Sequence, residues 1–155
     1  MFINTDDLGG TIYNYQMEQI TDGDDSIILE AIQAAESEVR SYLASNNKRE
    51  WNDGRPKYDI NKIFTAVGAQ RNALIVRHCA TIAKFYIVEL CNADIIYEQS
   101  KERYDRAVGW LKQLAKGEIN LDTLPIITQD DDESQGSTDD TSPFIYGSRE
   151  KFNHE

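Results

Sequence analysis

Residues 72–117 carry the strongest pattern in the chain and read NALIVRHCATIAKFYIVELCNADIIYEQSKERYDRAVGWLKQLAKG. In the first half, apolar side chains recur at helical spacing and form one face: Ile75, Cys79, Ile82, Ala83, Tyr86 and Leu90. The second half repeats the pattern: Tyr97, Tyr104, Ala107, Val108, Leu111, Leu114 and Ala115. Gly117 directly follows Lys116, which is typical of a helix end. We therefore predict two amphipathic helices, joined by a turn at residues 91–94, that pack against each other.

Polar side chains occupy the opposite faces of both predicted helices. On the first helix this face carries Arg77, Thr81 and Lys84. On the second helix it carries Glu102, Asp105, Arg106, Gly109, Lys112, Gln113 and Lys116. Each helix should bury one side only, which indicates a bundle rather than two isolated helices.

A third long helix is expected from about Ser26 to Ser45. Its buried stripe consists of Ile28, Ile32, Ala35, Val39, Tyr42 and Leu43. Glu30, Gln33, Ser37, Glu38 and Ser41 should face water. Glu36 and Arg40 are spaced to form an ion pair one turn apart. The acidic turn at residues 21–26 suits the helix start, where unpaired N–H groups attract negative charge.

The remaining segments of the first 127 residues show weaker patterns. Thr5 is suited to cap a short helical turn, and residues 12–20 suggest a short helix. Residues 46–71 read as an irregular loop, within which residues 58–67 fit either a short helix or a strand. Within this loop, Trp51 and Phe64 are expected to fold back onto the helices, the alternative being a partner contact at the loop tip.

The net charge of −11 over 155 residues is distributed unevenly. Residues 128–142 hold six acidic side chains and no basic one, which leaves −5 for the rest of the chain. This segment has the composition of a solvated linker, and binding of calcium by its Asp130–Glu133 run is disfavoured because the ligand spacing of a calcium loop is missing. We predict an all-α protein: a small antiparallel helical bundle at residues 1–127 with an irregular loop between the first and second long helices, an acidic linker at 128–142 and a C-terminal docking segment at 143–155.

Several functional classes are disfavoured by the sequence. Motifs for nucleotide binding, redox cysteine pairs and hydrolase nucleophiles are not found, so no cofactor, metal or catalytic residue is expected. His78 and Cys79 are adjacent in a predicted helix and should point about 100° apart. The two cysteines are expected to be reduced thiols, and neither a membrane span nor a signal peptide is expected. The overall acidity disfavours non-specific binding to nucleic acid.

The order of several short segments resembles that of the head–tail connector (head-completion) proteins of tailed bacteriophages, in the Mu-like branch. The similar pieces are the start at residues 1–8, the helix closing on 41–43, the helix around 82–86, residues 102–107 with Trp110-Leu111, the exit at 115–121 and the terminus at 144–152. The likeness lies in the combination and spans about the whole chain.

This resemblance implies a structural virion protein without catalytic activity. Such subunits form a ring, commonly of twelve, beneath the portal, where it extends the DNA channel and provides a platform for the tail or a stopper protein. Double-stranded DNA would pass through without specific binding, and assembly would take place in the host cytoplasm. Val88 and Trp110 are candidate subunit contacts. The alternative is an acidic helical regulator or DNA mimic that binds a basic protein surface.

The C-terminal segment is the predicted partner-binding element, because apolar and aromatic residues return there after the acidic linker. Its candidate contact residues, on the portal or on a neighbouring subunit, are Phe144, Ile145, Tyr146, Arg149, Lys151 and Phe152. The other reading is a tail that folds back on its own domain.

Overall fold

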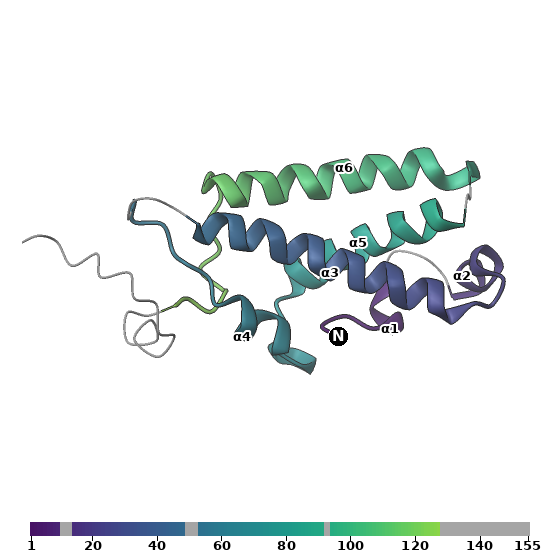
Figure 1. Ribbon diagram of the computed structural model, residues 1–155, viewed down its shortest axis with the longest axis horizontal. Helices are drawn as coiled ribbons and strands as arrows, with labels where there is room; N and C mark the ends of the chain where they lie inside the picture. Colours follow the sequence, from purple (N-terminus) through teal and green to yellow (C-terminus); the bar gives the residue numbers. More distant parts are fainter. Residues whose placement is uncertain (10–13, 49–52, 92–93, 128–155) are drawn as a thin grey trace, which may run out of the picture.

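The protein forms a bundle of three long helices, each antiparallel to the next long helix in the sequence, with shorter helices at its sides (Figure 1). The computed structural model describes residues 1–9, 14–48, 53–91 and 94–127. The long helices are α3 (Asp25–Asn47), α5 (Ala73–Leu90) and α6 (Asp94–Lys116), and each packs against the other two. The short ones are α1 (Thr5–Leu8), α2 (Asn14–Thr21), α4 (Ile60–Thr65) and the 3₁₀ turn η1 (Gly68–Gln70). The predicted all-helical bundle is confirmed.

Helix α3 begins where the acidic turn predicts. The backbone turns at Asp22 and Gly23, both with positive φ, and the side chain of Asp24 then accepts a hydrogen bond from the N–H of Ser26 at 2.9 Å. Such a cap satisfies an N–H group that the helix itself leaves unpaired. The predicted stripe is buried apart from Tyr42, which is half-buried against the core.

Helix α5 lies at the centre of the bundle and is buried on more than one side. It packs against α3 and α6, and also against α1 and α2, so apolar residues beyond the predicted stripe are needed to fill the contacts. Val88, expected on the polar side as a subunit contact, has no exposed surface, so that prediction is wrong. Leu90, expected in the buried stripe, is 48% exposed because it is the last residue of the helix.

Helix α6 matches its prediction more closely. Its inner residues Ala107, Val108, Leu111 and Leu114 are buried, and the predicted outer face is exposed throughout. The helix stops at Gly117, which adopts a φ of +76° that side chains disfavour. A Cβ atom at this position would also meet the end of the Arg55 side chain, which would have to move, but the positive φ is the reason that glycine is favoured here.

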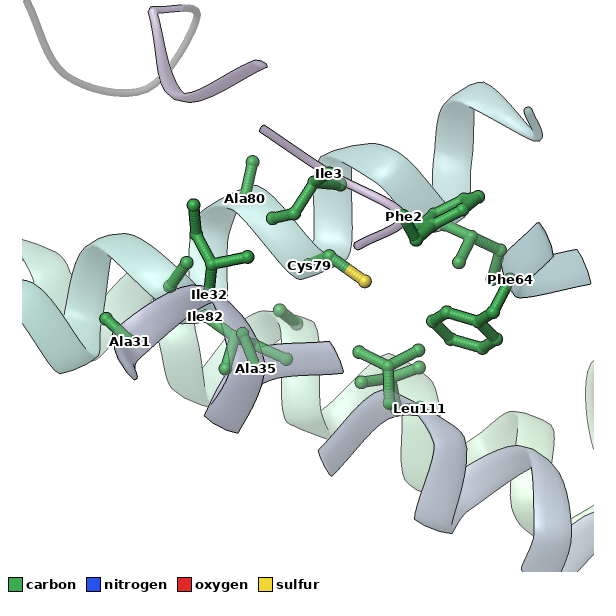
Figure 2. Close-up of a cluster of buried hydrophobic side chains, with 14 of the residues drawn as sticks. Phe2, Ile3, Ala31, Ile32, Ala35, Phe64, Cys79, Ala80, Ile82 and Leu111 are labelled. Carbon is green, nitrogen blue, oxygen red and sulfur yellow. The ribbon is translucent and has the colours of Figure 1, made fainter. Parts of the chain in front are cut away.

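The N-terminal residues belong to the core. Phe2 and Ile3 are buried, and Figure 2 shows them beside Phe64 and Cys79. The carboxylate of Glu36 accepts hydrogen bonds from the N–H groups of Phe2 and Ile3, at 2.5 and 2.9 Å. Glu36 therefore does not form the predicted ion pair with Arg40. Its carboxylate instead anchors the N-terminal residues to α3.

Two further local predictions are corrected next to this anchor. The guanidinium of Arg40 lies over the ring of Phe64, 4.2 Å from its centre. Helix α1 is capped by Asn4 rather than Thr5, in a reciprocal capping box with Asp7.

The irregular loop is tied through Tyr58 to the end of α3 and to the segment that follows α6, at the same end of the bundle (Figure 1). The N–H and C=O of Tyr58 pair with the side-chain amide of Asn47 at 2.9 and 2.7 Å, and its hydroxyl accepts from the N–H of Leu121 at 2.8 Å. Tyr58 also forms an isolated antiparallel bridge with Ile126. Residues 60–65 form helix α4, and Phe64 folds back onto the core as expected. Trp51 lies outside the described residues.

The predicted linker at 128–142 and docking segment at 143–155 also lie outside the described residues, and with them the candidate contacts Phe144, Ile145, Tyr146, Arg149, Lys151 and Phe152. Within the described ranges, none of the helices combines the length and apolar character that crossing a bilayer requires.

Candidate partner-binding groove

An open groove runs between the first half of α5 and the middle of α6. Its volume is about 780 Å³, and its lining includes Arg77, His78, Thr81, Arg103, Arg106 and Trp110. The α6 residues are three and four positions apart, so they share one face of that helix. Helices α5 and α6 pack antiparallel to each other (Figure 1), and side chains of both helices line the groove.

The groove is positively charged although the chain is acidic. Arg77 and Arg103 are exposed, and within the described residues neither has a carboxylate at ion-pair distance. Arg106 pairs with Glu102 at 2.8 Å, but both side chains are more than 70% exposed, so that pair contributes little. The pKa of Lys84 is lowered by burial and then by the positive charge of Arg103. Lys84 and Arg103 are therefore like charges placed close together on this side of the bundle.

The carboxylate of Asp7, which is part of the groove lining, is ionised, and its negative charge is balanced by an ion pair with Arg71. The ion pair with the guanidinium of Arg71 is bidentate, with N–O distances of 2.6 and 2.9 Å. The hydrogen bonding from Arg71 lowers the pKa of Asp7. Arg71 also donates to the carbonyl of Phe2 at 2.9 Å, which joins the start of the chain to the approach of α5.

A flat aromatic pair forms one wall of the groove. The rings of His78 and Trp110 stack with centroids 4.5 Å apart and planes inclined by 19°. Burial, and then the charge of Arg77, lowers the pKa of His78 to about 4, so the imidazole is neutral at pH 7. Its Nε2 atom is buried and has no hydrogen-bond partner within the described structure. The groove therefore combines arginine charge with a neutral aromatic surface.

His78 and Cys79 do not form a nucleophilic pair. The Cys79 side chain points into the core, within the cluster that Figure 2 draws, while His78 faces the groove. Burial, and then the nearby charge of Glu36, raises the pKa of the Cys79 thiol well above its ordinary value. Within the described ranges, no group of three or more metal-ligating side chains comes together.

A second polar cluster connects the three long helices. The hydroxyl groups of Tyr86 and Tyr104 donate to the carboxylate of Glu38 at 2.7 and 3.0 Å. Burial is the main cause that raises the pKa of Tyr104 to about 12. Glu38 was expected to face water and is instead half-buried, because the two tyrosines of the predicted stripes direct their hydroxyl groups towards it. This cluster fixes the relative positions of α3, α5 and α6.

The groove itself was not among the sequence predictions, although Trp110 was. Trp110 was expected as a subunit contact and is a half-buried residue of the groove wall, packed against the core. The spacing of Arg103, Arg106 and Trp110 signals a shared helix face, but their proximity to Arg77 depends on the register between two helices. Comparisons with protein-family models, characterised proteins and solved structures found no match.

Proposed function

We propose that this protein is a structural subunit of a tailed-bacteriophage virion. In this proposal it forms a ring at the head–tail junction beneath the portal, extends the DNA channel and provides a platform for the tail or a stopper protein. It assembles in the host cytoplasm and becomes part of the virion. The order of sequence segments that resemble the Mu-like connector family supports this specific assignment.

The observation that carries the proposal is the groove of α5 and α6. Arginine and tryptophan are residue types enriched where protein interfaces gain most of their binding energy. Here they line an open surface on a rigid helical body, and Arg77 and Arg103 have no carboxylate partner within the described chain. Such a surface suits a contact with a neighbouring subunit or the portal. Head-to-tail contacts of this kind join two different surfaces, and they form a ring when the rotation from one subunit to the next closes.

The C-terminal residues provide the second proposed contact. The apolar and basic residues at 144–152 would bind a neighbouring subunit or the portal, with residues 128–142 as their tether. We assign no catalytic residue, and Cys79→Ala, in the core and away from the groove, should leave assembly intact apart from a packing cost.

The alternative, an acidic regulator or DNA mimic, requires a negatively charged folded face. The groove is positive, and more than half of the net charge lies in residues 128–142. This alternative therefore has less support.

Assembly can be tested with the full chain by light scattering and negative-stain imaging, with and without a portal. We expect rings, and we expect Arg77→Ala combined with Arg103→Ala to weaken ring formation or portal binding. The matched control is Lys112→Ala with Lys116→Ala, on the opposite, exposed face of α6. Failure to form rings under either condition, or equal effects of the two double variants, would contradict the proposal.

Deletion of the residues after Ser142 tests the second contact. The helical domain should melt as before, while incorporation into phage heads falls. A large loss of thermal stability would show that the segment belongs to its own core. Normal incorporation would show that it is not a docking element.

A further inference from the structure

We propose that the acidic segment, residues 130–140, docks in the groove of its own chain. Its carboxylates would lie beside the guanidinium groups of Arg77 and Arg103. This inference goes beyond the proposed function and concerns the isolated chain, so it stands or falls separately from ring formation.

Charge complementarity is the first argument. The acidic segment contains Asp130, Asp131, Asp132, Glu133, Asp139 and Asp140, without any basic residue. The groove presents two arginines without a carboxylate partner in the described structure, and Arg103 lies close enough to Lys84 to lower its pKa. Carboxylates placed in the groove would reduce the repulsion between Arg103 and Lys84 and could form bidentate hydrogen bonds with the guanidinium groups.

The point at which the acidic segment leaves the body is the second argument. Thr123 accepts a hydrogen bond from the side chain of Asn72 at 2.9 Å, and Asn72 caps the start of α5. The next residue, Ala73, already lines the groove. The chain therefore passes the start of the groove at Thr123, and its described part ends four residues later at Ile127, whose N–H donates to the carbonyl of Lys57 at 2.8 Å.

The length of the chain permits the contact. Asp139 lies twelve residues after Ile127, and an extended chain reaches roughly 3.3 Å per residue, or about 40 Å. Helix α5 rises about 1.5 Å per residue, so Arg77 lies about 8 Å along the axis from Asn72. Even with the four residues from Thr123 to Ile127 leading away from α5, the acidic segment can reach both arginines.

The tether favours the segment of the same chain over that of a second copy. A short connection holds the carboxylates near the groove at an effective concentration in the millimolar range. A neighbouring copy in dilute solution supplies its segment at a far lower concentration. We therefore assign the acidic segment of the same chain, and not that of a second copy, as the occupant of the groove.

The test uses the full chain with Trp110 as its fluorescent reporter. Trp51→Phe removes the second tryptophan, Cys91→Ser removes the half-buried thiol, and Ser137→Cys allows attachment of a short-range quencher in the acidic segment. We expect strong quenching of Trp110 in dilute protein at low salt. Quenching should fall severalfold near 1 M salt, where the screening length decreases from about 10 Å at 0.1 M to about 3 Å.

Charge variants assign the contact. Arg77→Gln with Arg103→Gln should abolish the quenching, while Lys112→Gln with Lys116→Gln should retain it. Quenching should return when Arg77→Glu and Arg103→Glu are combined with Asp139→Lys and Asp140→Lys, the acidic residues that the chain length allows to reach both positions. All the substituted arginines and lysines are exposed, and helical circular dichroism checks that each variant folds.

Two results would overturn the inference. One is quenching that is absent, or that does not respond to the arginine variants. The other comes from mixing quencher-labelled chains that carry Trp110→Phe with unlabelled chains. If quenching appears in this mixture and not in a dilute single species, the acidic segment docks on a neighbouring copy instead of its own groove.

Discussion

The imidazole of His78 stacks on the indole of Trp110 in a half-buried position between α5 and α6, with ring centroids 4.5 Å apart. The pKa of His78 is lowered to about 4 from an ordinary value of 6.5, chiefly by burial. Between these two values the unfolded chain binds a proton at His78 that the folded protein does not bind. Unfolding is therefore favoured as the pH falls through this window, and the stabilisation is complete above pH 6.5.

The stability of the wild-type protein should thus decrease between pH 6.5 and pH 4 more than that of His78→Phe, which keeps an aromatic ring and cannot titrate. We expect a difference of about 1–2 kcal/mol, well below the full shift because solvent screens a half-buried ring. Urea unfolding at both pH values measures it. His154→Gln is the control and should behave as wild type. Parallel pH profiles for wild type and His78→Phe would show that His78 titrates normally in the folded protein.

Glu36 should be the most sensitive acidic residue of α3. Glu36→Ala leaves the buried N–H groups of Phe2 and Ile3 without their acceptor, which should cost about 2–3 kcal/mol. The control is Glu30→Ala on the exposed face of the same helix. Denaturant unfolding gives the cost, and hydrogen exchange should accelerate at residues 2–8. Equal stability of the two variants would mean that the anchor contributes nothing.

A charge in the core should unfold the bundle. Ile82→Asp and Leu111→Asp each place a carboxylate where the wild-type side chain has no exposed surface, at a cost of several kcal/mol. Lys112→Asp, next to Leu111 on the exposed face, should cost far less. Thermal melts followed by far-UV circular dichroism compare the three. Melting of either core variant within error of wild type would refute the core assignment.

The two thiols should differ sharply in reactivity. Cys79 is fully buried and its raised pKa suppresses the thiolate, whereas Cys91 is half-buried at the end of α5. A thiol reagent such as DTNB should modify Cys91 in the native protein and reach Cys79 only at the rate of unfolding. Cys91→Ser should then abolish the fast phase. Comparable rates at both positions in the native state would show that the core opens readily.

The long helices could be predicted from the sequence because their buried stripes repeat within single segments. Helices α3 and α6 each bury one side, and for them the helical period is sufficient. It failed at Val88 because α5 is contacted from several directions, and the period of one helix does not contain that information. The boundary of α1 shifted by one residue since Asn4 and Thr5 are both suitable caps.

The features that depend on long-range contacts could not be predicted. In the sequence, Glu36 looks like an ordinary surface residue of a helix, spaced to pair with Arg40 one turn later. It becomes a buried acceptor only because the N-terminal residues pack back against α3. Arg77 and Arg103 likewise resemble solvated surface charges until the register of α5 and α6 places them along one groove. The Glu38 cluster arises in the same way, from two tyrosines on other helices.

The attachment at Tyr58 determines how mechanical force would enter the protein. The backbone of Asp59 donates to the carbonyl of Pro125 at 2.9 Å, and that of Ile127 donates to the carbonyl of Lys57 at 2.8 Å. A pull on the C-terminal residues is therefore borne first by these two bonds. From there the load passes through Tyr58 to Asn47 at the end of α3. Helix α6 would come under tension only after these bonds break. The loop at residues 57–59 would therefore resist a pull on the C-terminal residues before the helices of the bundle separate.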